Sequence, residues 1–101
     1  MKLSKEEIAD YKEEIQELTE LLNTEWEDLK EMLSEEINLE GALLCGYMED
    51  EDEGEYGVVL TKDKQIYNFS IQDGELQVTK IDDVRDIEED YPQILVALNN
   101  F

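Results

Sequence analysis

The feature that most constrains the fold is an apolar stripe through the first third of the chain. Between Ser4 and Ile37, apolar residues recur at intervals of three or four, so on an α-helix they all fall on one side. The stripe consists of Ile8, Tyr11, Ile15, Leu18, Leu22, Trp26, Leu29, Leu33 and Ile37. This pattern predicts a long amphipathic helix whose stripe forms either core or a dimer contact.

The ends of this helix carry capping signals. Residues 4–7 have the form of a capping box, in which the Ser4 hydroxyl accepts from the backbone N–H of Glu7. Residues 24–27 form a second such box, which allows a break near Asn23-Thr24. We favour one continuous helix, because the stripe keeps its phase and no Gly or Pro intervenes. Such a helix is about 50 Å long, so we expect one end to protrude or to pair with another copy in a homodimer.

The remaining chain alternates in the manner of β-strands. Strands are predicted over residues 42–48, 56–61, 65–71 and 76–81, with a bulge near Gly46 and a type I′ hairpin turn at Asp73-Gly74. Pro92 begins a short final helix whose predicted buried face carries Ile94, Leu95, Leu98 and Phe101. We therefore predict one α+β domain over residues 1–101, an antiparallel four-stranded meander with the helices on one face.

The charge of the chain excludes several classes of partner. Its 101 residues include 29 Asp and Glu but only eight Lys and Arg, giving a net charge of −21 and a pI near 4.1. Direct nucleic-acid binding needs cationic side chains, and anionic lipid repels an acidic helix. No apolar run is long enough to span a membrane, and no signal-peptide pattern is visible. We expect a cytoplasmic protein, in which the single cysteine, Cys45, is buried and inert.

Residue types that usually carry catalysis are scarce. The chain has no histidine, no nucleophile-elbow serine and no glycine-rich phosphate loop, so we expect a non-enzymatic protein without a cofactor. Residues 49–55 are acidic and are predicted to be a loop, and calcium prefers clustered oxygen ligands, so we compared them with the calcium-binding loop template. When Gly54 is aligned with the template glycine, the bidentate Glu position falls on Leu60, and the template fails. We therefore expect no metal site.

Carboxylates on the helix form the more informative pattern. They recur three or four residues apart beside or opposite the apolar stripe, and with residues 49–55 and 82–90 they make up a candidate acidic binding surface. That surface comprises Glu6, Asp10, Glu13, Glu17, Glu20, Glu27, Glu31, Glu35, Glu49, Asp50, Glu51, Asp52, Glu53, Glu55, Asp86, Glu88, Glu89 and Asp90. Like charges at these spacings destabilise an isolated helix, which favours a functional reason for the row.

Two functional hypotheses follow from this acidic surface. The first is a nucleic-acid mimic that occupies the basic groove of a DNA- or RNA-binding protein or effector complex and inhibits it. In size and charge, though not in any motif, the chain resembles small phage or mobile-element proteins of the anti-CRISPR or anti-restriction type. The second is an adaptor or immunity-type interaction module, whose charge serves solubility and whose contacts come from the stripe or from a surface aromatic such as Tyr47 or Tyr91.

Overall fold

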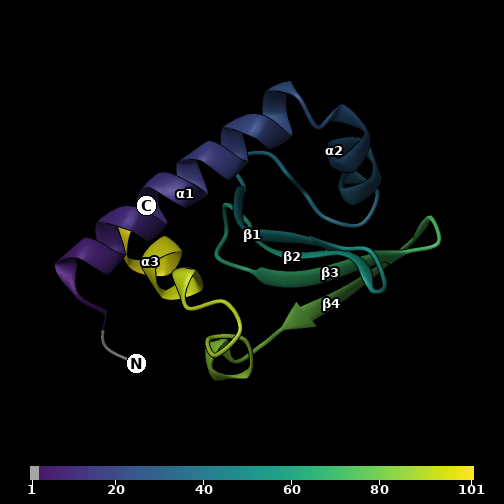
Figure 1. Cartoon of the computed structure of the whole chain (residues 1–101). Helices are drawn as coiled ribbons and strands as arrows, with labels where there is room; N and C mark the ends of the chain where they lie inside the picture. The colour runs from purple at the N-terminus through teal and green to yellow at the C-terminus, as the bar shows by residue number, and fades with distance from the viewer. Residues whose placement is uncertain (1–2) are drawn as a thin grey trace.

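The computed structural model describes residues 3–101, with every side chain in that range except that of Asn100 (Figure 1). Its elements, in chain order, are α1 (Lys5–Thr24), α2 (Glu27–Ser34), β1 (Leu43–Asp50), β2 (Gly54–Leu60), β3 (Ile66–Gln72), β4 (Glu75–Ile81), a 3₁₀ turn η1 (Val84–Asp86) and α3 (Gln93–Asn100). The strands pair antiparallel in the order β1-β2-β3-β4. The predicted α+β class and the four-stranded meander are therefore confirmed.

The first helix begins where its capping box predicts. The backbone N–H of Glu7 donates to Ser4 Oγ at 3.1 Å, and the N–H of Ser4 donates to the Glu7 carboxylate at 3.1 Å. This reciprocal pair satisfies two of the amides that a helix start leaves without a partner.

The preference for one continuous helix was wrong, because the chain leaves helical geometry at Glu25 and Trp26. Thr24 does not cap a second helix; its hydroxyl instead donates back to the carbonyl of Glu20 at 2.8 Å. Trp26 takes φ −101° and ψ 56°, outside the helical region, and its N–H bonds to Leu21 O, five residues back. The change of direction brings α2 over the sheet (Figure 1), and the molecule measures only 37 × 26 × 26 Å. The expected protruding end is therefore absent from residues 3–101.

The helices cover both faces of the sheet, whereas we expected them on one. Leu44, Val59 and Phe69 share one face, here called the α2 face, and pack with residues of α2 and the second half of α1. Val58 and Leu60 point to the opposite face, here called the α3 face, and pack with α3 and the first half of α1. Because consecutive β2 residues are fully buried, both sides of this part of the sheet need a cover.

The β1 edge of the sheet is covered by α1. The backbone N–H of Leu44 donates to Thr19 Oγ1 at 3.0 Å, which satisfies an edge amide that no strand pairs with. The predicted bulge is present, because Cys45 is inserted between the paired positions Leu44 and Gly46. A Cβ on Gly46 would lie 2.6 Å from Tyr91 Cδ1, so the glycine makes room for that ring.

The turns show one confirmation and one correction. Asp73 and Gly74 have φ values of 52° and 80°, as the predicted type I′ turn requires. Residues 49–55 are not a seven-residue loop, since β1 continues to Asp50 and β2 begins at Gly54. The Asp50 carboxylate accepts from the N–H groups of Asp52 at 2.8 Å and Glu53 at 3.2 Å, which closes the short turn between the strands.

The final helix is buried on more than one side. α3 lies between α1 and one end of the sheet (Figure 1), so Val96 and Ala97 are buried together with Ile94. Phe101 was expected on the buried face, but its side chain is 42% exposed and lies under the Lys12 ammonium, 5.8 Å from the ring centroid. The prediction that α3 buries one face is therefore wrong, because both α1 and the sheet pack against this helix.

Candidate acidic binding surface

The most regular group of carboxylates is a line along the outer side of α1. This group, here called the α1 row, contains five exposed residues on the side of the helix opposite the buried Ile15: Glu6, Asp10, Glu13, Glu17 and Glu20. Neither lysine of α1, Lys5 or Lys12, stands three or four residues from a carboxylate. Within residues 3–101, the one ion pair found joins Arg85 to Asp83, so the α1 row has no intramolecular cation partner there.

The acidic line does not continue along a single rod through residue 35, as the continuous helix implied. Glu27, Glu31 and Glu35 are exposed, but they follow the break at Glu25-Trp26 and belong to α2 and its C-terminal cap. Since α2 lies over the α2 face, these residues form a separate acidic group.

The β1–β2 hairpin presents four exposed carboxylates at or near its tip, from Glu49, Glu51, Asp52 and Glu53. The other two predicted members have structural partners. Asp50 accepts the turn amides, and the Glu55 carboxylate accepts from the Tyr47 hydroxyl. Burial and then that hydrogen bond raise the pKa of Tyr47, so the phenol stays protonated as the donor.

The Tyr47–Glu55 pair lies beside the helix break. The Trp26 ring packs against the Tyr47 ring with centroids 5.0 Å apart, and both residues line a pocket of about 350 Å³. Glu27 and Glu55 belong to the same pocket, so the fold brings together two predicted acidic residues that are distant in sequence.

The acidic segment before α3 holds the single arginine of the chain. The Arg85 guanidinium donates to both oxygens of Asp83, with Nε 3.2 Å from Oδ1 and Nη2 2.8 Å from Oδ2. The side-chain hydrogen bond from Arg85 lowers the pKa of Asp83, and the same contact raises the pKa of Arg85. Asp86, Glu89 and Asp90 are exposed and Glu88 is half-buried.

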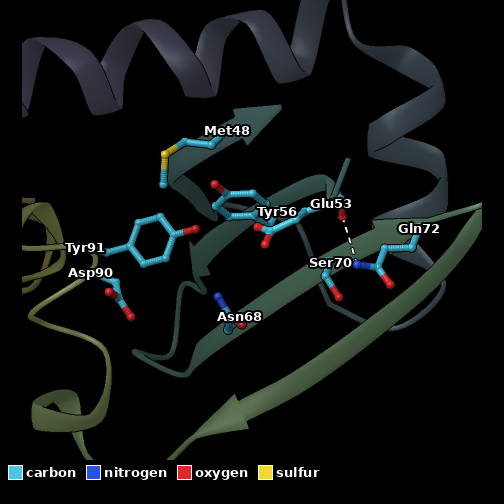
Figure 2. Close-up of a pocket in the computed structure, with 8 residues that line it drawn as sticks. All are labelled: Met48, Glu53, Tyr56, Asn68, Ser70, Gln72, Asp90 and Tyr91. Carbon is cyan, nitrogen blue, oxygen red and sulfur yellow. Dashed lines mark hydrogen bonds between the residues drawn. The ribbon is translucent and has the colours of Figure 1, made fainter. Parts of the chain in front are cut away.

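α3 covers only one end of the α3 face, and the uncovered part is here called the open half (Figure 1). Two of these acidic segments meet on this open half. Glu53 from the hairpin tip and Asp90 from the segment before α3 line one pocket of about 520 Å³ (Figure 2). Of its other lining residues, Tyr91 was expected from the sequence to be a surface aromatic, but it is buried. Sequence reasoning missed the rest, which are Met48, Tyr56, Asn68, Ser70 and Gln72. A signal for three of them was present, because the polar residues 68, 70 and 72 alternate with the apolar side chains of β3.

Tyr91 is the one residue in this pocket with an unsatisfied buried group. Its side chain is 3% exposed, and among the described residues its hydroxyl is the only buried side-chain N or O atom without a hydrogen-bond partner. Burial, followed by the neighbouring Tyr56 and Asp90, raises the pKa of Tyr91 to about 12. An unpaired buried hydroxyl costs about 1–3 kcal/mol, so this group has an unused capacity for hydrogen bonding.

The apolar stripe is occupied within the chain. Each of its nine residues is buried or half-buried, and all belong to the two apolar clusters on the two faces of the sheet. Homodimerisation through the N-terminal helix stays a prediction, and it would have to use other side chains of that helix.

Neither metal binding nor membrane insertion gains support from the described part of the chain. Within residues 3–101, no group of three or more Asp, Glu or Cys side chains is arranged to hold a metal ion. No helix among these residues is both long and apolar enough to cross a membrane. No family model, curated protein or solved structure matches the chain.

Proposed function

We propose that this protein is a nucleic-acid mimic that binds and inhibits a basic DNA- or RNA-binding protein. The observation that carries the proposal is the α1 row, a straight line of exposed carboxylates on a helix whose opposite side is fixed to the core. A row held in this way is available to a partner without a cost for ordering the backbone.

The charge spacing along α1 supports this choice of partner. Seven carboxylates stand between Glu6 and Glu20, since Glu7 and Glu14 flank the α1 row. With a rise of about 1.5 Å per residue, they cover about 21 Å, or one charge per 3.5 Å. The phosphates of one strand of B-DNA follow one another at about 3.4 Å along the axis. A groove that accepts a phosphate strand therefore meets a similar density of negative charge on α1.

The lack of cations on this helix face also favours binding over solubility alone. A helix that is merely soluble commonly alternates charges, because pairs of opposite sign at three or four residues stabilise it. Here the two lysines of α1 lie away from such positions, and Lys12 contacts Phe101 instead. The arrangement maximises the negative field of the helix, which would accelerate association with a cationic surface.

In this proposal the acidic hairpin tip and the segment before α3 extend the charged surface beyond α1. In this proposal the protein acts in the host cytoplasm. It inhibits a host nuclease or CRISPR effector, as phage or mobile-element anti-defence proteins do. The core, in contrast, serves to hold α1 straight and is not itself a contact surface.

The test is affinity capture at two salt concentrations. Immobilised protein is incubated with a nuclease-treated cell lysate, and the bound proteins are identified after elution with salt or with duplex DNA. The proposal predicts a nucleic-acid-binding protein that elutes with either agent and whose DNA or RNA binding is inhibited by the free chain. Capture of proteins that resist both salt and polyanion would contradict it.

A further inference from the structure

The pocket on the open half of the α3 face has a chemistry distinct from that of the α1 row. α3 covers only one end of this face, so the side chains of Tyr56, Asn68 and Ser70 remain on an uncovered stretch of sheet (Figures 1 and 2). The pocket volume of about 520 Å³ lies within the range of about 300–1,000 Å³ that is usual for ligand sites.

The hydrogen-bonding groups of the pocket are mainly acceptors. The amide nitrogen of Asn68 already donates to Gly57 O at 3.0 Å, and that of Gln72 donates to Glu53 O at 2.9 Å (Figure 2 shows the second bond). The amide oxygens of both side chains accept no hydrogen bond from the described residues and remain available. Glu53 and Asp90 add two carboxylates, and the described lining contains no Lys or Arg.

Tyr91 supplies an independent indication of a ligand. Its hydroxyl is buried without a partner, lines this pocket, and points toward the Tyr56 side in Figure 2. The ring cannot withdraw toward β1, because it is packed against Gly46 with no space for even a Cβ. Met48, which lines the same pocket and is 43% exposed, has a flexible side chain that can repack around a ligand.

These groups together select a donor-rich, planar cation. A guanidinium has five N–H donors and no acceptor, and it stacks on aromatic rings such as those of Tyr56 and Tyr91. An ammonium has three donors around a single point and stronger hydration, so it matches separated acceptors less well. An anion is repelled by the two carboxylates.

We propose that this pocket receives an arginine side chain of a basic protein partner, held between Glu53 and Asp90 and hydrogen-bonded to the Tyr91 hydroxyl. The inference rests on the proposed function for the identity of the partner, since arginine is the side chain most used to bind phosphate backbones. The mimic would then have a second point of contact. This pocket is specific for the shape of one side chain, whereas the α1 row interacts with the partner through charge alone.

The first experiment titrates ¹⁵N-labelled protein with N-acetyl-argininamide and, separately, with N-acetyl-lysinamide at equal ionic strength. The side-chain amide signals of Asn68 and Gln72 report directly on the pocket. The proposal predicts saturable shifts of these signals with the arginine probe and at least about tenfold weaker binding of the lysine probe, the size expected for losing one hydrogen bond to a charged group. Equal binding of the two probes, or shifts spread along α1 without the pocket signals, would overturn it.

Two variants locate the site. Tyr91→Phe removes only the unpartnered hydroxyl, and the exposed pair Glu53→Gln with Asp90→Asn removes both charges; each is expected to weaken the arginine probe by about tenfold or more. The matched control, Glu13→Gln with Glu17→Gln, removes the same charge from α1 and should change probe affinity less than about twofold. If the control weakens binding as much as the pocket pair, the pocket has no specific role. Should Tyr91→Phe fail to fold, the exposed pair still decides the question.

The two proposals fail in different ways. If the arginine probe does not bind the pocket while neutralised α1 still loses the captured partner, the arginine site is wrong and the mimic stands. If the probe binds the pocket but DNA does not compete with the partner, the mimic is wrong and the arginine site stands.

Discussion

Neutralising the α1 row should make the protein more stable and less able to bind. The perturbation is the quadruple variant Asp10→Asn, Glu13→Gln, Glu17→Gln and Glu20→Gln. Glu6 is kept, because a negative charge in the first turn of α1 stabilises the helix through its dipole. Asn and Gln differ little from Asp and Glu in helix propensity, so the change is mainly one of charge.

The size of the stability change follows from the spacing of the row. The variant removes seven like-charge pairs at three or four residues, counted with the flanking Glu7 and Glu14 and running from Glu6–Asp10 to Glu17–Glu20. At about 0.2–0.5 kcal/mol for each pair, the free energy of unfolding should rise by about 1.5–3.5 kcal/mol. For a domain of about 100 residues this raises Tm by about 4 °C or more.

Thermal melts followed by circular dichroism measure this gain. It should be largest at about 10 mM salt, where the Debye length is about 30 Å, and small at 1 M, where it is about 3 Å. The same four substitutions would also remove four ion pairs between the α1 row and the proposed basic partner. At about 0.2–1 kcal/mol for each pair, partner binding should weaken by a factor of about four to several hundred.

A control variant separates the row from total charge. It removes four exposed carboxylates at sites outside the proposed surface: Glu36→Gln, Glu40→Gln, Asp73→Asn and Glu75→Gln. Net charge changes equally, so this variant should retain partner affinity within about twofold. An unchanged Tm at low salt in the row variant would refute the repulsion argument, and equal loss of binding in both variants would refute the role of the row.

Three further outcomes test the fold. Gly57→Ala places a Cβ 2.3 Å from Gly46 O and 2.8 Å from the ring of Phe69, so it should lower the free energy of unfolding in urea titrations by about 1–3 kcal/mol; wild-type stability would contradict this packing. Ser4→Ala loses the reciprocal cap and should cost about 1 kcal/mol in the same assay, whereas no change would show that the cap contributes nothing. Burial raises the pKa of the Cys45 thiol from 9.0 to about 12. The stability that the buried neutral thiol contributes is therefore complete below pH 9 and is lost as the pH rises toward 12. In thermal melts between pH 8 and 12, the Tm of Cys45→Ala should fall less steeply than that of wild type, and parallel falls in Tm would contradict the burial of this thiol.

Local sequence signals predicted local structure well. The capping box at Ser4, the bulge beside Gly46 and the type I′ turn at Asp73-Gly74 each depend on a few adjacent residues, and all are present. The order of strands followed from their short connections, because consecutive strands with short turns pair as antiparallel neighbours.

The helix break was not favoured from the sequence, although residues 24–27 allowed one nearby, because its cause is not local. The stripe stays in phase through Trp26, so periodicity alone cannot distinguish one rod from two helices that fold over the same sheet. What decides is tertiary burial: the turn at Glu25 lays Trp26 against Tyr47 and Leu33 into the cluster on the α2 face. A straight rod would have left part of the stripe exposed to water.

The candidate site was only partly visible for the same reason. Charge composition and helical spacing identified the α1 row directly from the sequence. The pocket required the fold, because Glu53 and Asp90 are 37 positions apart and meet only across the open sheet face. The unpaired hydroxyl of Tyr91 could not be predicted from the sequence, because the burial of this side chain depends on the tertiary position of Gly46 and α3.

The central claim, that α1 occupies a groove made for nucleic acid, is tested most directly by competition on the captured partner. Labelled protein bound to that partner is titrated with duplex DNA or RNA at constant ionic strength, and its release is followed by fluorescence anisotropy. Mutually exclusive binding is predicted: anisotropy should fall to the value of free protein as nucleic acid saturates the partner. A ternary complex that retains the labelled protein at saturating nucleic acid would contradict the account.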